Sequence, residues 1–494
     1  MGARAWLAAV LLAACSPTQT ASSRVDSGAG GSGGDAGTAN ADDGAHSGER
    51  LKIVWWVFND GTRTWDGTLY DTERKENCFI YEGWSDGKTY CAPLKANSNV
   101  VFTDAACSQK AVQVFTDPNC PAAAPPSILD YDYTTCSENP ARVYQRGGKL
   151  ATVAQYYLNY GTGCIGPFDD DGDSDYYALG PLATDLAEVT LADAPDAGTG
   201  RLSTRMWTST DGLALPARMR DSQLGTDCFA AYLGPGAQSS LCDPETAGYF
   251  SYAHDASCSV PEFDASPGCA APAIASTYSS SCPYDNGQYF EVGAKTSAPP
   301  LFIGDSASSC SQATPVSGDS YFAATGAALS LAPLSRTVDS AANKRIQLIH
   351  LTTPDGLAYR DQTLFDATSG TECFPEQLPD GTKLCFPEVP YGVSAYYSDA
   401  GCSTELDLVE VYTGGSTCQA TPAAKYTEEF VAPEPGTCNY SYEVHSVGGK
   451  HTGTVFTGFP GECSVYAPTT SELYDVGPIV PFSQFAAATT QTGE

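Results

Sequence analysis

Four aspartates at alternate positions form the pattern in this sequence that most resembles a metal site. They lie in the stretch "FDDDGDSDYY" and are Asp169, Asp171, Asp173 and Asp175. Calcium-binding loops place carboxylates at alternate positions, but the EF-hand pattern also needs glycine at its sixth position and glutamate at its twelfth. Ser174 occupies the sixth position here, and the glutamate is missing. We therefore interpret the stretch as a solvated acidic loop, with a weak Ca²⁺ site as the alternative, and we expect no other cofactor.

No combination of residues predicts a catalytic centre. The stretch "FIGDSASS" around Ser306 resembles the Gly-Asp-Ser block of some esterases, but no histidine in residues 51–494 has an aspartate three positions before it. Gly-x-Ser-x-Gly and His-Glu-x-x-His are also absent from those residues. A glycosidase needs only two carboxylates that flank a sugar, and no pair stands out among 58 acidic residues. Five tryptophans could stack on sugars: Trp55, Trp56, Trp65, Trp84 and Trp207.

The nineteen cysteines are the most regular feature of the sequence. Cys15 stands alone, and the other eighteen fall into three sets of six with closely similar gaps. The sets begin at Cys78, Cys228 and Cys373, which gives a period of about 145–150 residues. Even sets of this kind in an exported chain predict three disulfides per set. A zinc site is not expected, because no Cys-x-x-Cys occurs and the histidines do not follow the cysteines in step.

Six cysteines allow fifteen pairing patterns, and the sequence does not decide among them. We favour sequential neighbours, because the first two cysteines of a set flank an expected hairpin with an Asp-Gly turn, as at Asp86-Gly87. Cysteines at the two ends of such a hairpin would face each other. The expected disulfides are Cys78–Cys91, Cys107–Cys120, Cys136–Cys164, Cys228–Cys242, Cys258–Cys269, Cys282–Cys310, Cys373–Cys385, Cys402–Cys418 and Cys438–Cys463.

Aspartates recur in step with the cysteines. Three precede the first cysteine of a set by seven residues, and three others precede the third cysteine by three: Asp71, Asp221 and Asp366, then Asp104, Asp255 and Asp399. The second group lies in "VFTDAACS", "SYAHDASCS" and "YYSDAGCS". There the carboxylate is expected to end a strand by accepting backbone N–H bonds in an Asx-type turn. From these recurrences we infer three tandem repeats, at residues 51–198, 199–343 and 344–494.

Short apolar runs predict β-strands along all three repeats, for example "KIVWWVF", "AVQVF", "EVTLA" and "RIQLIHL". No long apolar pattern of helical period appears. Gly-Gly-Lys at 147–149 and 448–450 resembles a further hairpin turn. About eight strands per repeat, in two halves of four, favour an all-β protein with a six-bladed β-propeller-like ring. Three separate small β domains in a row are the alternative.

The first fifteen residues resemble the signal of a bacterial lipoprotein. Arg4 precedes the apolar run "WLAAVLLAA", which is too short to span a bilayer, and Leu12-Ala13-Ala14-Cys15 matches a lipobox. The resemblance implies that residues 1–14 are a signal peptide and that Cys15 carries acyl chains such as palmitate. Residues 15–50 are largely Gly, Ser, Ala, Thr and Asp, so they predict a disordered tether that buries too little apolar surface to order itself.

The formal net charge of −33 excludes nucleic acid as an expected partner, because a polyanion is repelled by phosphates. The expected partners are the lipid bilayer, through Cys15, and a protein or glycan ligand. The expected location is the cell envelope, at the outer membrane or the cell surface.

The recurring run Asp, Cys-Phe, Asp-Gly, Cys-x-Pro and Tyr-x-Asp-Ala-x-Cys resembles a family of Cys-rich repeats in lipoproteins and secreted proteins of myxobacteria. The resemblance covers residues 51–494, less cleanly in the middle repeat, where "LGPGAQSSLC" lacks the Asp-Gly turn. It implies an exported repeat protein and supplies no catalytic residues. We therefore favour a non-catalytic, disulfide-linked β scaffold for binding or adhesion. The alternatives are an envelope carbohydrate-active hydrolase and a Ca²⁺-stabilised structural module.

Overall fold

The protein is described by a computed structural model that covers residues 44–493 with internal gaps. The gaps are residues 117–123, 133–140, 160–162, 171, 196–199, 232–237, 246–247, 251, 266–268, 278–287, 297–299, 305–309, 316–317, 340–342, 390–391, 413–424, 432–440, 460 and 469–470. The expected all-β class is confirmed. Within the described residues, the helical structure is one short 3₁₀ turn, η2 (Phe482–Gln484). The strands form one 15-stranded sheet and three smaller sheets of seven, eight and seven strands.

The 15-stranded central sheet draws on all three predicted repeats. Its strands are β1 (Leu51–Phe58), β2 (Arg63–Asp71), β3 (Glu76–Tyr81), β4 (Thr89–Pro93), β12 (Glu188–Asp193), β13 (Leu202–Thr208), β14 (Ala214–Asp221), β15 (Thr226–Ala230), β16 (Ser239–Pro244), β25 (Pro333–Val338), β26 (Ile346–Thr352), β27 (Ala358–Asp366), β28 (Thr371–Gln377), β29 (Lys383–Pro387) and β37 (Ala488–Thr492). Consecutive strands form antiparallel hairpins. The strands β12, β25 and β37 each connect one group of four hairpin strands to the next.

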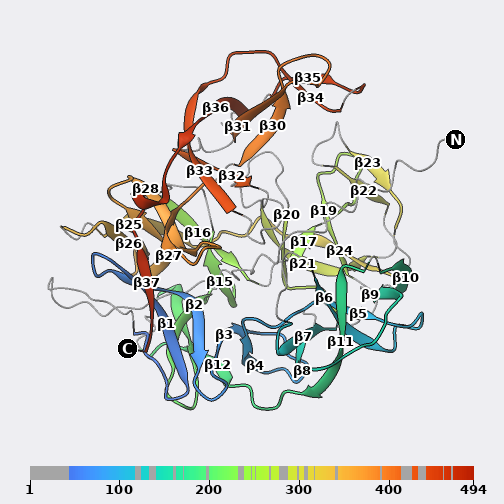
Figure 1. Ribbon diagram of the computed structural model, residues 1–494, viewed down its shortest axis with the longest axis vertical. Coiled ribbons are helices and arrows are strands. Elements are labelled where there is room, and N and C mark those ends of the chain that lie inside the picture. Colours follow the sequence, from blue (N-terminus) through green and yellow to red (C-terminus); the bar gives the residue numbers. More distant parts are fainter. Residues whose placement is uncertain are drawn as a thin grey trace.

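The central sheet closes into a ring. The last strand, β37, pairs with the first, β1, from Val54↔Thr492 to Phe58↔Ala488, and Figure 1 shows the red β37 beside the blue β1. On its other side, Leu384 of β29 forms an antiparallel bridge with Ala487, and the Cys385 amide donates to the Ala486 carbonyl at 2.8 Å. The equivalent amides of Cys91 and Cys242 donate just ahead of β12 and β25. The same joint therefore occurs three times around the ring.

Each smaller sheet is built from one continuous stretch of chain, and Figure 1 shows β34–β36 at the top, away from β1 and β2. The first has β5 (Val100–Phe102), β6 (Lys110–Phe115), β7 (Ser127–Tyr131), β8 (Ala141–Lys149), β9 (Gln155–Asn159), β10 (Cys164–Asp169) and β11 (Ser174–Leu182). The second has β17 (Gly248–Phe250), β18 (Tyr252–Ala253), β19 (Pro261–Ala265), β20 (Ile274–Thr277), β21 (Tyr289–Thr296), β22 (Leu301–Ile303), β23 (Ser311–Ala313) and β24 (Ser320–Thr325). The third has β30 (Val393–Tyr397), β31 (Glu405–Tyr412), β32 (Tyr426–Val431), β33 (Ser441–Lys450), β34 (Val455–Thr457), β35 (Ser464–Tyr466) and β36 (Ser471–Ile479).

The six-bladed propeller is not the fold. Propeller blades are separate four-stranded sheets around a channel, whereas here the first half of each predicted repeat joins one continuous sheet. The alternative of separate small β domains fits the three outer sheets. The boundaries at 198/199 and 343/344 stay a prediction.

The expected strands "KIVWWVF", "AVQVF", "EVTLA" and "RIQLIHL" are confirmed as β1, β6, β12 and β26. The Gly-Gly-Lys runs are not turns, because they lie inside β8 and β33. Both strands pair with a neighbour through shifted registers. A Cβ at Gly147 or Gly448 would lie within 2.7 Å of a carbonyl oxygen of that neighbour. Glycine is therefore required at these positions by close approach of two strands.

Three apolar clusters hold the ring together, and each contains a buried disulfide at a joint between predicted repeats. Cys78 and Cys91 pack with Trp207 and Leu215. Cys228 and Cys242 pack with Leu351 and Tyr359, and Cys373 and Cys385 pack with Trp56 and Phe58. The expected pairings of the first with the second cysteine are confirmed at all three places, with Cα–Cα separations of 5.3–5.4 Å.

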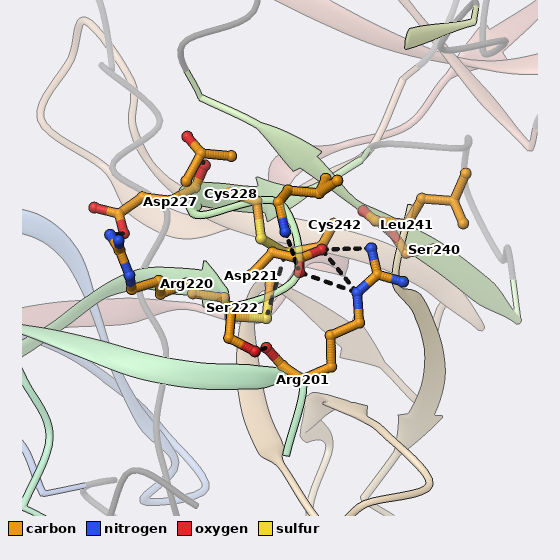
Figure 2. Close-up of a disulfide and its surroundings, with 12 residues drawn as sticks. Arg201, Arg220, Asp221, Ser222, Asp227, Cys228, Ser240, Leu241 and Cys242 are labelled. Carbon is orange, nitrogen blue, oxygen red and sulfur yellow. Dashed lines mark hydrogen bonds and ion pairs between the residues drawn. A yellow bond between two sulfur atoms is a disulfide. The ribbon is translucent and has the colours of Figure 1, made fainter. Parts of the chain in front are cut away.

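Three ion pairs, each between a partly exposed arginine and a buried aspartate, fix the starts of the equivalent hairpins. In each, an arginine guanidinium reaches the aspartate that lies seven residues before the first cysteine, at 2.7 Å: Arg50–Asp71, Arg201–Asp221 and Arg345–Asp366. Figure 2 shows Arg201 facing the Asp221 carboxylate beside the Cys228–Cys242 disulfide. Asp221 Oδ1 also accepts the N–H groups of Gln223 and Leu224. Sequence reasoning identified the aspartates and missed the arginines, although these recur 20 or 21 residues before them.

Contacts between predicted repeats also run head to tail around the ring. The carboxylates of the Asp-Gly turns accept backbone N–H bonds from residues in, or just before, the first strand of another predicted repeat. Asp60 accepts from Ile346 at 2.7 Å, Asp211 from Leu51 at 2.8 Å and Asp355 from Arg201 at 2.8 Å. Because the three contacts form a cycle, each stretch is held by both of the others.

The other expected disulfides are wrong, because the third cysteine of each set pairs with the sixth. The observed bonds are Cys107–Cys164, Cys258–Cys310 and Cys402–Cys463. They replace the expected Cys107–Cys120, Cys136–Cys164, Cys258–Cys269, Cys282–Cys310, Cys402–Cys418 and Cys438–Cys463. The cause is a long-range strand contact. Phe102 of β5 pairs with Tyr157 of β9, and this brings Cys164, at the start of β10, beside the turn that holds Cys107. Cys269 is also disulfide-bonded, and Cys120, Cys136, Cys282, Cys418 and Cys438 lie outside the described residues.

Candidate functional site

The recurring Asp-Ala-x-Cys-Ser stretches are Asx-type turns, as expected from the sequence. Asp399 accepts backbone N–H bonds from Gly401, Ser403 and Thr404 at 2.9, 3.2 and 2.6 Å. Asp104 and Asp255 make the corresponding bonds to their own turns. The third cysteine of each set has φ between 47° and 52°, a left-handed conformation that non-glycine residues rarely adopt. A disulfide and at least two backbone N–H bonds to the aspartate hold each turn, so its role is architectural.

The Asp399 turn should lose stability only in strong acid. The Thr404 N–H bond, with those from Gly401 and Ser403, lowers the pKa of Asp399 to about 2 from an ordinary 3.8. A lowered pKa means that the ionised carboxylate stabilises the fold above about pH 4 and that this contribution is lost as the pH falls towards 2. An NMR titration of the Asp399 carboxyl should show a midpoint near 2. Ser403→Ala removes the hydroxyl donor to Asp399 and should raise this midpoint. A midpoint at the ordinary value of 3.8 in both the wild type and the variant would contradict this account.

The four alternate aspartates are not gathered around a common centre in the described residues. Asp169 accepts from the Gln155 side chain at 2.9 Å, and Asp175 forms an ion pair with Lys149 at 2.6 Å. The backbone carbonyl of Asp173 accepts from Thr116, and Asp171 lies outside the described residues. The Ca²⁺ alternative therefore stays a prediction.

The five tryptophans that could stack on sugars are buried, with exposed fractions of 2–7%. Trp55 and Trp56 point to opposite faces of β1 and belong to two different clusters. Trp65 lies under the Arg360 guanidinium, whose Cζ is 4.9 Å from the ring centroid. Four of the five therefore serve the ring core, and Trp84 alone among them lines a surface hollow.

The hollow beside Trp84 has a volume of about 230 Å³ and lies between the β3–β4 turn and the first outer sheet. Its apolar lining comes from Trp84, Val143 and Leu186, and Leu182 stands half exposed at its edge. Tyr90 packs edge-on against Trp84, with ring centroids 5.2 Å apart. An apolar floor with a few polar groups at the rim is the usual form of a small-ligand site.

The polar groups of the hollow are Asp86, Arg142, Ser85, Tyr90 and Thr184. The Tyr90 hydroxyl donates to Asp86 at 2.8 Å, and Arg142 Nε donates to Ser85 Oγ at 3.1 Å. Slight burial works to raise the pKa of Asp86, but the bonds from Tyr90 and the Lys88 amide outweigh it and lower the pKa. Burial and the bond to Asp86 raise the pKa of Tyr90, so the phenol keeps its proton. The rim thus offers an anionic acceptor and a guanidinium donor, and no activated nucleophile.

In the third predicted repeat an apolar cluster holds the corresponding place: Leu378, Phe386, Val444 and Phe485 pack together, with Phe482 against them. The sequence identified Trp84 as a residue that could bind a sugar, but it did not reveal the hollow. The residues that line the hollow come from stretches up to about a hundred positions apart.

Two further residues named from the sequence also lie outside the described part of the chain. They are Cys15, the expected lipidation site, and Ser306 of the esterase-like stretch. Among the described residues, no helix is long and apolar enough to cross a membrane.

The fold and its cross-links define a class: a disulfide-rich all-β protein of an oxidising compartment, because buried disulfides recur at every joint of the ring. The chain belongs to a family of unknown function, DUF7481, whose family model matches residues 29–485. No curated protein and no solved structure matches it.

Proposed function

We propose that the protein is a cell-envelope lipoprotein, anchored through Cys15, that serves as a non-catalytic scaffold and binds a glycan at the hollow beside Trp84. The lipobox-like Leu12-Ala13-Ala14-Cys15 supports the anchor. The closed ring, fixed by a disulfide and an ion pair at each joint, supports a scaffold role, because such cross-linking limits internal motion.

The hollow carries the binding half of the proposal. A sugar ring presents both C–H faces and hydroxyls, which match the apolar floor of Trp84 and Leu186 and the polar rim of Asp86 and Arg142. The Arg142 guanidinium at the rim favours a glycan with carboxylated sugars, since Arg binds carboxylates through paired N–H donors.

A glycan array, followed by calorimetry with the best ligand, tests the binding half. Arg142→Ala should weaken binding about 10-fold or more, because a hydrogen bond to a charged group contributes about 1.5–3 kcal/mol. Arg220→Ala is the matched control, because Arg220 is a surface arginine of the central sheet that pairs with Asp227; it should leave binding unchanged. Equal affinities for the wild type, Arg142→Ala and Arg220→Ala, or release of reducing sugar from the ligand, would contradict the proposal.

The anchoring half of the proposal is tested by lipid labelling. Labelled palmitate should be incorporated into the wild type and not into Cys15→Ser.

A further inference from the structure

Strands β32 and β33 place two glutamates directly opposite each other. Glu429 and Glu443 are register partners in this antiparallel pair, and like charges in that position destabilise a sheet. Counted back from Gly-Gly-Lys, the same positions of β7 and β8 hold Asp130 and Arg142, which have opposite charges. The third outer sheet therefore carries two acids where the first has an acid and a base, and Asp130 in the first sheet is also paired with Lys110 at 2.8 Å.

A buried histidine completes the group. His445 lies two residues after Glu443, on the same face of β33, and is only 7% exposed. Its Nδ1 is 3.1 Å from the Gly477 carbonyl oxygen. Because a carbonyl only accepts, Nδ1 carries a proton, and Nε2 is the ring nitrogen that faces the glutamates. Nε2 is buried without a hydrogen-bond partner, 3.2 Å from Glu429 Oε2 and 3.6 Å from Glu443 Oε2.

The separations of these atoms fit a shared cation. In a tetrahedral site with bonds of about 2.0–2.2 Å, neighbouring ligand atoms stand roughly 3.3–3.6 Å apart. All three ligand atoms lie within 4.8 Å of one another, and this is the one such group found in the part of the chain that the structure describes. A cation bound between the three atoms would give buried Nε2 a partner and would offset the repulsion between the two carboxylates.

We propose that Glu429, Glu443 and His445 bind a divalent transition-metal ion of the Zn²⁺ class. One imidazole and two carboxylates suit Zn²⁺ better than Ca²⁺, which prefers six or more oxygens. The Gly477 carbonyl holds the ring in the required tautomer, as backbone carbonyls do for metal-binding histidines. A Cβ at Gly477 would lie 2.5 Å from the Ser446 carbonyl oxygen, so close approach of β36 to β33 requires glycine there. The ion would join β32 to β33 beside β36.

Calorimetry on the EDTA-treated, dialysed full chain tests the site, with Zn²⁺ as the probe and about 150 mM salt to suppress non-specific binding to the acidic surface. The expected result is one tight equivalent per chain. Glu429→Gln/Glu443→Gln keeps the shapes of the two side chains and should weaken Zn²⁺ binding by at least ~100-fold. His445→Ala should do the same. Losing a residue that only hydrogen-bonds to a metal ligand costs less, about 10–100-fold in affinity.

His451→Ala is the matched control, because His451 on the same outer sheet pairs with one carboxylate, Asp475, at 2.8 Å. It should keep the tight equivalent. Co²⁺ loaded in place of Zn²⁺ should give a visible absorption band in the wild type and not in the double glutamine variant. The proposal fails if wild type and double variant bind Zn²⁺ equally, if neither binds it, or if Ca²⁺ binds this group and Zn²⁺ does not.

Discussion

Cys107→Ser/Cys164→Ser should destabilise the first outer sheet by about 4 kcal/mol. This disulfide closes a loop of 57 residues, and the stabilisation from restricting the unfolded chain grows with the length of the loop. The hairpin bond Cys78–Cys91 closes 13 residues and should contribute about 3 kcal/mol. The Cys107 backbone lies in the left-handed region, so this turn also depends on the cross-link to hold its conformation.

Hydrogen exchange followed by mass spectrometry gives the measurement, because it separates the outer sheet from the ring. In the Cys107→Ser/Cys164→Ser chain, protection should fall across β5, β9 and β10 and stay unchanged in β26–β29. The Cys78→Ser/Cys91→Ser chain should lose protection in β3 and β4 instead. Equal loss over both regions in either chain would show that the two bonds do not stabilise separate parts.

Asp221→Ala should lower the free energy of unfolding of the central sheet by about 3 kcal/mol. Removing one partner of a buried ion pair leaves the other charge without compensation, at a cost of about 3–5 kcal/mol. The lower end applies because the Arg201 side chain is 24% exposed and keeps some contact with water. The substitution also removes the acceptor of the Gln223 and Leu224 backbone N–H groups. Because Asp221 is fully buried, water does not easily replace its carboxylate there.

Urea unfolding followed by tryptophan fluorescence measures this effect, because Trp55, Trp56, Trp65 and Trp207 all lie in the central sheet. Asp193→Ala is the matched control. Asp193 also pairs with an arginine, Arg205 at 3.2 Å, but its side chain is 66% exposed, so its loss should cost under about 1 kcal/mol. Similar midpoint shifts in the two variants would mean that the Arg201–Asp221 pair does not stabilise the ring.

Local features of the fold followed from the sequence. The strand β1, the Asp-Gly hairpin at Asp86 and the Asx turn at Asp399 each depend on residues close together in the chain. The hairpin disulfide Cys78–Cys91 was predictable for the same reason, since turn geometry alone brings its ends together. The error over Gly-Gly-Lys is instructive, because glycine serves both turns and close strand contacts, and the sequence does not distinguish them.

The sequence alone determined the all-β class, the six-cysteine period and the recurring aspartates, because these depend on composition and short-range spacing. The tertiary structure decided which distant strands pair. The contact of β5 with β9 selected Cys164 as the partner of Cys107, and the contact of β37 with β1 closed the ring. It also placed His445 beside Glu429 on the neighbouring strand, and it brought Trp84 and Leu182, nearly a hundred residues apart, to the same hollow. Such contacts arise from the packing of whole sheets, which no local pattern specifies.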